Sequence, residues 1–278
     1  MTYAPALAPI EYRLQAAIDQ VQDQDGVTIS VTAKKKTLLK FGRHTTLGTT
    51  AAMIWNYGAL APTETLPTTN AITHIVSSSA ADVGITVNVE YHTISGANLT
   101  FGVQPVTLNG QTPVALTVPC ARTSRINNTS ATNLAGTVVT YESSGATVTA
   151  GVVTPPTLVH AAVTAATTFP GTGQQTRKGA TSISQFDYFL VTMWHGHMLG
   201  STNSRADLQL QKRSTTGVWL PTGVDMGLSV SGTTGSPTQL DPVVPIANNH
   251  DIRVMGQATS SNTDVSVYIG GYLASIVA

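Results

Sequence analysis

The residues best suited to chemistry in this chain are two histidines, His195 and His197, separated by one glycine. Residues two apart on a β-strand point to the same face, and imidazole is the commonest metal ligand in proteins. A metal site would need further ligands, and no third ligand lies nearby in the sequence. Neither His250 nor Asp251 can be placed beside the pair from sequence alone. We therefore interpret the histidines as exposed side chains at a strand end, with no metal or cofactor.

Paired carboxylates and activated serines are the other chemistry to consider. Glycoside hydrolysis needs two carboxylates that meet in space, and the candidates are Glu90 and Glu142, with Glu64 nearby in the sequence. The Gly-x-Ser-x-Gly motif that presents a nucleophilic serine on a sharp turn does not occur. A Ser-His-Asp triad could still assemble from distant loops. We expect no enzymatic activity and assign no catalytic residue.

The low content of charged residues limits the classes of partner that we expect the chain to bind. The chain has 278 residues, of which only 10% are charged, with 14 basic and 14 acidic side chains and a net charge of zero. Because nucleic-acid binding needs many phosphate contacts from Lys and Arg, no specific nucleic-acid partner is expected. A surface of Thr, Ser, Asn and Gln loses water cheaply on contact, which suits protein–protein assembly. The high Thr content alternatively reflects β propensity alone.

Targeting and redox features are sparse. Cys120 is the only cysteine, so an intrachain disulfide or a Cys-based zinc site is excluded. The first residues lack a basic stretch followed by an apolar one, which argues against a secretory signal. No run approaches the roughly 20 apolar residues that a membrane helix needs. The expected environment is a cytoplasm, without a membrane partner.

Alternation of apolar and polar residues dominates the chain from residue 73 onward. The clearest strands are Ile85–Thr93 and Asp264–Leu273, the latter with Val265, Val267 and Ile269 inward. Gly270-Gly271 marks a bulge, a kink or a close approach by another backbone. The other strands that we predict are Thr73–Ser77, Phe101–Leu108, Arg122–Ile126, Thr137–Glu142, Val152–Thr154, Leu158–Val163, Ile183–His195, Leu208–Gln211, Val218–Leu220, Met226–Val230 and Ile252–Met255.

Three finer predictions concern local pairing. Asn109-Gly110 favours a two-residue hairpin turn between strands ending in Leu108 and starting at Val114. Val152–Thr154 and Leu158–Val163 could pair with one another. Ile183–His195 is apolar on both faces, which is typical of a strand buried between layers; Trp194 is expected to share a face with Tyr188 and Leu190, opposite Phe189, Val191 and Met193.

Residues 1–60 differ from the remainder. Ile10, Leu14, Ala17, Ile18 and Val21 have helical spacing, and Asp25-Gly26 ends the predicted helix. Val27–Thr32 follows as one strand. The basic cluster Lys34–Lys36, with Lys40 and Arg43, either forms a solvated turn or faces DNA or an acidic partner. This segment has too few apolar residues for its own core, so we interpret it as a docking arm.

The predicted organisation is therefore all-β: two β-sandwich or jelly-roll-like domains preceded by an N-terminal arm with a short helix. Short strands separated at high frequency by Gly, Pro, Asn and Ser favour these folds. The predicted boundaries are 1–60 for the arm, 61–175 for the first domain and 176–278 for the second.

Several short segments form an ordered series along the chain: Lys40–Arg43, Trp55, Val76–Asp82, Val106–Val114, Arg122, Arg125-Ile126, Asp251–Val254 and Asn262–Ser266. In this order they resemble a family of tailed-bacteriophage virion structural proteins. The resemblance covers residues 40–273, and the loop that in the family usually follows the position of Asp82 is here only Val83-Gly84.

The resemblance implies a non-enzymatic β-sandwich protein of the phage head, neck or tail. The implied function is a capsid decoration or cement protein, or a head–neck accessory subunit. Implied partners are the major capsid, portal, neck or tail proteins and other copies of the chain, in a trimer or ring within a virion assembled in the host cytoplasm. The alternative is a tail fibre or a receptor- or carbohydrate-binding module, in which Tyr91, Tyr141, Trp219 and Tyr272 could stack on sugars.

Overall fold

The computed structural model describes residues 36–55, 66–165, 174–184, 187–199, 205–229, 238–260 and 263–274. Within them the regular structure is antiparallel β-sheet and one short 3-10 turn, which confirms the all-β prediction. The predicted N-terminal helix, the strand at 27–32, Lys34, Lys35 and Glu64 lie outside the described residues.

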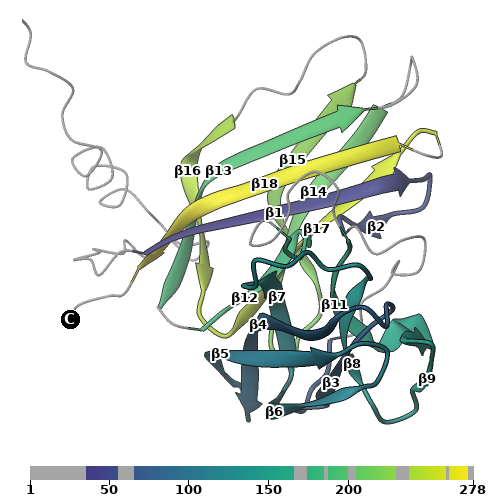
Figure 1. Ribbon diagram of the computed structural model, residues 1–278. Helices are drawn as coiled ribbons and strands as arrows, with labels where there is room; N and C mark the ends of the chain where they lie inside the picture. The colour runs from purple at the N-terminus through teal and green to yellow at the C-terminus, as the bar shows by residue number, and fades with distance from the viewer. Residues whose placement is uncertain are drawn as a thin grey trace, which may run out of the picture.

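Four sheets form two pairs, which occupy the lower and upper parts of Figure 1, and a fifth, two-stranded sheet accompanies the lower pair. We call the two pairs the N-terminal and the C-terminal sheet pair. The strands of the first are β3 (Ile72–Ser77), β4 (Val83–Ser95), β5 (Asn98–Asn109), β6 (Val114–Cys120), β7 (Arg122–Asn128), β8 (Val138–Glu142), β9 (Thr147–Thr149), β10 (Val152–Thr154) and β11 (Val159–Val163). The strands of the second are β1 (Lys36–Leu47), β2 (Ala52–Met53), β12 (Ala180–Ile183), β13 (Tyr188–Leu199), β14 (Arg205–Ser214), β15 (Leu220–Ser229), β16 (Thr238–Ala247), β17 (His250–Ala258) and β18 (Thr263–Ala274).

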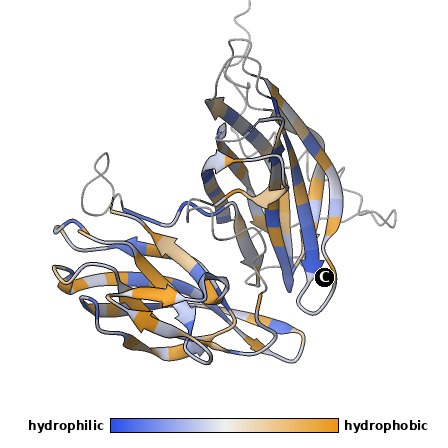
Figure 2. Cartoon of the chain, turned by 90° about the vertical axis from the view of Figure 1, so that its right-hand side faces the viewer, coloured by the Kyte–Doolittle hydropathy of each residue, from blue (hydrophilic) through white to orange (hydrophobic). Residues whose placement is uncertain are grey.

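Each sheet pair encloses a core of its own. In the N-terminal pair, the sheet β11-β8-β3-β6 packs on the sheet β5-β4-β7 around residues such as Ile75, Val87 and Ile126. In the C-terminal pair, β1-β18-β13-β16 packs on β12-β17-β14-β15 around Trp194 and Val267. Bands of opposite hydropathy alternate along these strands in Figure 2, as expected where one face of a strand is buried. A third cluster, which includes Trp55 and Tyr141, joins the two pairs.

The segment around residues 36–55 departs from the docking arm expected for residues 1–60. β1 lies along β18 with a continuous register from Lys36 to His44 and a shift before Leu47, and β2 pairs with β17. The first and last described strands are therefore neighbours in one sheet (Figure 1). The inward face of β1 carries Lys40, Gly42 and His44, whereas Leu39 and Phe41 point outward. Because polar residues and glycine face inward and apolar residues face outward, the alternation of apolar and polar residues did not predict this strand. The boundaries proposed for the two domains remain predictions.

β18 matches its prediction closely. Val265, Val267 and Ile269 are fully buried between the sheets. Gly270 and Gly271 face β13 at a bulge, where Val191 pairs with Gly271 and Met193 with Gly270. A Cβ atom on Gly271 would lie 2.0 Å from the carbonyl oxygen of Leu190. β18 lies between β1 and β13 in the sheet. The backbone that approaches Gly271 closely is therefore that of β13 in the same chain, and not that of a neighbouring subunit.

Replacing Gly271 by alanine is expected to lower the free energy of unfolding by about 3 kcal/mol or more, because backbone must move to admit the methyl group. Gly48→Ala is the control, since its Cβ would meet nothing within 4 Å, and should change stability by about 0.5 kcal/mol or less. Urea unfolding of both variants measures the difference. Equal stability of the two variants would contradict the packing described for Gly271.

Bulges reassign the faces of two predicted strands. In β13 a bulge lies between Val191 and Met193. The extra residue turns the side chains that follow it to the opposite face of the sheet, so Trp194 lies in the core with Phe189 and Val191. The predicted grouping of Trp194 with Tyr188 and Leu190 is wrong for that reason. In β4 the shift between Glu90 and Tyr91 likewise turns His92 inward, where it is 2% exposed. A bulge changes the alternation without a strong sequence signal.

The turn at Asn109-Gly110 forms, but it does not make a hairpin. Thr112 N–H donates to the Asn109 carbonyl at 3.0 Å, and Gly110 has a φ of 56°, a value that favours glycine. β5 continues into β6 in the opposite sheet, where β6 pairs with β3. The turn therefore crosses the core from one sheet to the other.

Asp82 anchors the loop beside this turn. Its carboxylate accepts hydrogen bonds from Ser77 Oγ at 2.5 Å, Ala135 N at 2.7 Å and Gly136 N at 3.1 Å, and the side chain is fully buried. Ser77 N also donates to the Gly110 carbonyl at 3.2 Å. Two of the segments that resemble the phage family, Val76–Asp82 and Val106–Val114, thus contact each other.

Three further strand predictions need correction. β10 pairs with β9 and β11 with β8, and the turn Pro156–Leu158 separates β10 from β11. Leu220–Ser229 is one strand, whereas Val218 is 74% exposed outside it. β16 was not predicted at all. It contains two prolines and lies at the edge of its sheet, the place where proline is tolerated because one side needs no partner.

Candidate functional site

The contact between the two sheet pairs is held by a buried ion pair. Arg122 of β7 binds Asp251 of β17 through two N–H groups, Nε to Oδ1 at 3.0 Å and Nη2 to Oδ2 at 3.0 Å. Arg213 Nε and Ser182 Oγ donate to the same carboxylate at 3.2 and 2.5 Å. The side chains of Arg122 and Asp251 are 3% and 1% exposed. A parallel, bidentate geometry in so dry a place gives a strong and orientation-specific contact.

Arg122 also joins segments that flank the ion pair. Its Nη1 donates to the carbonyl oxygens of Ala121 and Pro67. Nearby, Thr215 Oγ1 donates to the Ala97 carbonyl at 2.8 Å, and Leu99 N donates to Asn249 Oδ1 at 2.8 Å. The last two bonds connect residues that are 118 and 150 positions apart in the sequence. We call this set of contacts the polar junction.

Lys40 reaches the polar junction from β1. Its Nζ donates to the Ser124 carbonyl of β7 at 3.0 Å, and the residue is 6% exposed. Burial and the nearby Arg125 guanidinium lower the pKa of Lys40 to about 7, against the opposing attraction of Glu90. Burial also lowers the pKa of His92 to about 3, so its ring, 3.3 Å from Ser124 Oγ, is neutral at pH 7. A cavity of about 340 Å³ adjoins these groups.

The lowered pKa of Lys40 predicts a pH dependence of stability. Between about pH 7 and its ordinary pKa of 10.5, the unfolded chain binds a proton that the folded chain releases, so stability rises with pH. Below about pH 7 Lys40 is charged in both the folded and the unfolded chain, so the folded chain bears the full free-energy cost of burying that charge. One proton corresponds to a slope of at most about 1.4 kcal/mol per pH unit.

We expect the wild-type protein to gain stability relative to Lys40→Met between about pH 7 and pH 8.5. Denaturant unfolding at several pH values, taken as the difference between the two proteins, measures the gain. The upper limit avoids Cys120, whose pKa burial raises to about 11 from 9.0 and whose titration acts in the opposite direction. Parallel pH profiles for the two proteins would contradict the assignment.

A groove beside the polar junction gathers basic and aromatic side chains. β1, β7, β18 and the segment before β12 line this space of about 630 Å³, which we call the basic groove. Arg43 pairs with Asp264 at 2.5 Å and Arg125 with Glu90 at 3.6 Å. The Arg177 guanidinium lies 6.0 Å from the Phe41 ring centre. The groove is lined by Leu39, Lys40, Phe41, Arg43, Arg125, Gln175, Thr176, Arg177 and Tyr268.

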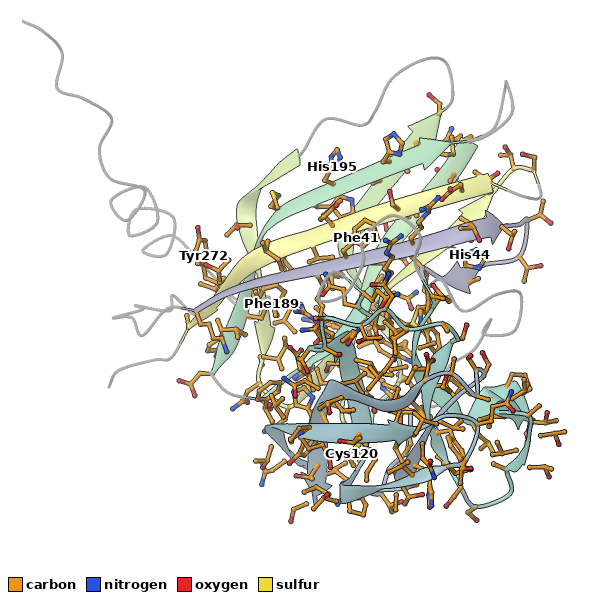
Figure 3. All side chains as sticks on the ribbon, in the orientation of Figure 1. Phe41, His44, Cys120, Phe189, His195 and Tyr272 are labelled. Atoms are coloured by element: carbon orange, nitrogen blue, oxygen red, sulfur yellow. The ribbon has the colours of Figure 1, made fainter. Side chains whose placement is uncertain are left out.

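The outer face of β1, β18 and β13 continues from the basic groove as three rows of side chains. Figure 3 labels Phe41 and His195 on this sheet. The strand register aligns Leu39 with Gly270 and Met193, then Phe41 with Tyr268 and His195, then Arg43 with Ser266 and His197. The rings of Phe41 and Tyr268 are 4.6 Å apart, and those of Tyr268 and His195 are 6.2 Å apart. We call these nine residues the outer grid.

The predicted histidine pair thus lies on the outer grid. His195 and His197 point to the same side, as the spacing predicts, while Gly196 faces Met226 and Leu228 in the core. His250 and Asp251 are on β17 in the opposite sheet; Asp251 binds Arg122, and His250 Nδ1 lies 2.9 Å from the Asn248 carbonyl. Within the part of the chain that the structure describes, no group of three or more His, Cys, Asp or Glu is placed to bind a metal.

The carboxylate and cysteine candidates have individual partners. Glu90 pairs with Arg125, and Glu142 Oε1 lies 2.7 Å from His160 Nε2. The two glutamates belong to different sheets. Cys120 is buried, with its sulfur 3.8 Å from Thr123 Oγ1. Its raised pKa keeps the thiol protonated, and so weakly nucleophilic, at neutral pH.

Of the four aromatic residues expected to stack on sugars, one is buried, and Tyr91, Trp219 and Tyr272 are half-buried. Tyr141 is 2% exposed. The Trp219 ring lies within 4.1 Å of the Arg253 guanidinium and 4.8 Å of that of Arg213. Tyr91 packs over Gly102 against the core. The aromatic pair in the basic groove, Phe41 and Tyr268, was not among the candidates, because hydropathy analysis did not identify β1 as a strand.

Comparison with known proteins does not assign a family. No family model and no curated protein matches the chain, so the phage family suggested by the ordered segments is not confirmed. No helix among the described residues is long and apolar enough to cross a membrane.

The solved structures with some similarity are distant. A subviral particle of infectious bursal disease virus VP2 aligns with a TM-score of 0.23 at 10% identity, over 96% of this chain and 78% of that one. The Gt strain of the same virus gives 0.18 at 10% identity, over 96% and 83%. A tryptic core variant of Bacillus thuringiensis Cry1Da gives 0.15 at 11% identity, over 74% and 51%. Scores this low do not separate one β fold from another.

Proposed function

We propose that this chain is a non-enzymatic structural protein of a phage virion, acting through protein–protein contacts as a capsid decoration or cement protein or as a head–neck accessory subunit. The observation that carries the proposal is the location of the segments that resemble that family. Arg122 and Asp251 form the buried ion pair, and Lys40 bonds to the segment that contains Arg125. Three of these segments, Lys40–Arg43, Arg122 and Asp251–Val254, therefore meet at the polar junction although they are scattered in sequence.

A convergence of this kind is what a shared scaffold requires. Side chains that lock two sheet pairs together are constrained in type and spacing, whereas exposed loops are free to vary. Matching segments confined to exposed turns would have suggested a chance likeness. The polar junction links the two sheet pairs by hydrogen bonds and a buried ion pair, which suits a subunit that presents both pairs to its neighbours.

The surface composition supports assembly over catalysis. The described nucleophiles and carboxylates that sequence analysis identified have individual structural partners. A protein surface with few charged side chains is desolvated at a low free-energy cost when it contacts another protein. The partners we propose are the major capsid, portal, neck or tail proteins and further copies of the chain in a trimer or ring. The carbohydrate-binding alternative is less favoured, because Tyr141 is buried and one face of the half-buried Trp219 ring is engaged by arginines.

The proposal is tested on particles. Quantitative mass spectrometry of purified virions should find the protein in many copies, in a fixed ratio to the major capsid protein. Cryo-electron microscopy with an antibody label then assigns it to the head, neck or tail. Recovery only from the infected cell, with none in purified virions, would overturn the proposal. Binding on a glycan array, combined with a tail location, would favour the alternative.

A further inference from the structure

We propose that the basic groove and the adjoining outer grid bind the acidic N-terminal segment, residues 10–26, of a second copy of this chain. The inference deepens the proposed function and rests on it, since it assigns a route of self-assembly. The groove offers cations and exposed apolar side chains together. Leu39 is 54% exposed and Tyr268 43% exposed, and Arg177 has no carboxylate partner among the described residues.

The charge distribution along the chain identifies the occupant. Residues 10–26 contain four carboxylates and one arginine, a net charge of −3. Residues 1–9 are uncharged, so the remaining 252 residues, 27–278, hold 13 of the 14 basic and 10 of the 14 acidic side chains. A neutral protein has thus separated its charge into an acidic segment and a basic body. Complementary surfaces of this kind favour association and fix its orientation.

The apolar pattern of the segment matches the outer grid. Ile10, Leu14, Ala17, Ile18 and Val21 fall on one face of the predicted helix. A helix over the 12 residues from Ile10 to Val21 would be about 18 Å long. The outer grid covers roughly 13 Å along the strands and roughly 10 Å across them, and the basic groove extends it toward Arg125 and Arg177. An amphipathic helix laid in an apolar groove is a common recognition mode.

The sequence that connects the segment to β1 favours a second copy over the same chain. Residues 27–35 contain no Gly, Pro, Asn or Asp, and Ser30 is their one residue of a type common in turns. Nine residues in the extended conformation predicted for Val27–Thr32 would span about 30 Å, whereas the basic groove begins only three residues along β1. Head-to-tail docking of this type builds rings or open chains.

The test uses the full-length protein and two charge-reversed variants. Arg177→Glu alters the groove, and Asp19→Lys/Asp23→Lys alters the segment. Arg205→Glu is the control, because Arg205 is 63% exposed on β14 and pairs with Asp207 in the other sheet of the C-terminal pair. Analytical ultracentrifugation should find a wild-type oligomer that weakens as salt increases from about 0.05 M to about 0.5 M. Each charge-reversed variant should dissociate at least about tenfold more readily, whereas the control should not.

Mixing the two charge-reversed variants distinguishes docking of the segment on a second copy from docking on the same chain. Each variant retains one intact half of the contact, so a mixture should recover paired species that neither forms alone. Photocrosslinking from position 41, with one copy isotope-labelled, should join residues 10–26 of one copy to the groove of the other. Crosslinks within a single copy would overturn the proposal in favour of docking in the same chain. A wild-type monomer at all concentrations would also overturn it.

These outcomes are independent of the virion experiment. A monomeric protein that is abundant in virions would contradict the self-docking inference and leave the structural role intact. A salt-sensitive oligomer that is absent from virions would do the reverse.

Discussion

Asp251→Ala is expected to lower the free energy of unfolding by about 3–5 kcal/mol, because removing one partner leaves a buried charge without compensation. The stranded group is Arg122, whose side chain is 3% exposed. Arg213 and Ser182 lose an acceptor at the same time. The expected loss is a large part of the roughly 5–15 kcal/mol that stabilises a typical domain. Chemical denaturation followed by tryptophan fluorescence measures it.

Two control variants distinguish the effect of leaving a buried charge unpaired from the effect of simply losing an ion pair. Asp207→Ala breaks an ion pair in which both side chains are 63% exposed, and should cost about 1 kcal/mol or less. The double variant Arg122→Met/Asp251→Leu removes both buried charges and should be more stable than Asp251→Ala, because no charge of that pair is left unpaired. A similar, small effect of Asp251→Ala and Asp207→Ala would contradict the role given to the polar junction.

Local patterns were sufficient to predict the strands whose buried face is apolar. β18 and the first half of β4 alternate strictly, and their inward residues are those expected. Prediction failed where another principle dominated. In β1 the inward face is built from Lys40, Gly42 and His44, because that face meets the polar junction and a close glycine contact with Gly179 instead of an apolar core. In β16, prolines that argue against a central strand are accommodated at a sheet edge.

Tertiary register explains the other differences. A bulge moves every following side chain to the opposite face, which is why Trp194 shares a face with Phe189 and Val191 and why His92 is buried. Asn109-Gly110 indicates a turn, but the turn itself does not say whether the two strands share a sheet. Such features depend on partner strands far away in sequence.

The candidate site was the least predictable part. Arg122 and Asp251 are 129 residues apart, and no local spacing associates them. Both appear among the segments that resemble the phage family, yet the resemblance did not indicate that they touch. The basic groove likewise combines four separate stretches of sequence. Sequence patterns describe one strand at a time, whereas this site is made where two sheet pairs meet.

The second large effect concerns truncation of the N-terminus. Deleting residues 1–35 should leave the unfolding free energy nearly unchanged, while deleting residues 1–47 should unfold or aggregate the protein. The longer deletion removes β1 and leaves the N–H and C=O groups along that side of β18 without partners, an edge that invites aggregation. It also removes the Arg43–Asp264 pair, the Lys40 bond to Ser124 and the fully buried Leu47.

This result would revise the expectation that residues 1–60 form a detachable arm, because it would assign β1 to the folded body. Circular dichroism, thermal unfolding and ultracentrifugation of the two truncations measure it. The shorter deletion should remain folded but lose the salt-sensitive oligomer, since it lacks residues 10–26 and retains the groove. Removal of Leu47 alone, as Leu47→Ala, should cost about 2–5 kcal/mol and serves as a lower reference for the loss of the whole strand. A stable, monodisperse protein lacking residues 1–47 would contradict the assignment of β1 to the fold.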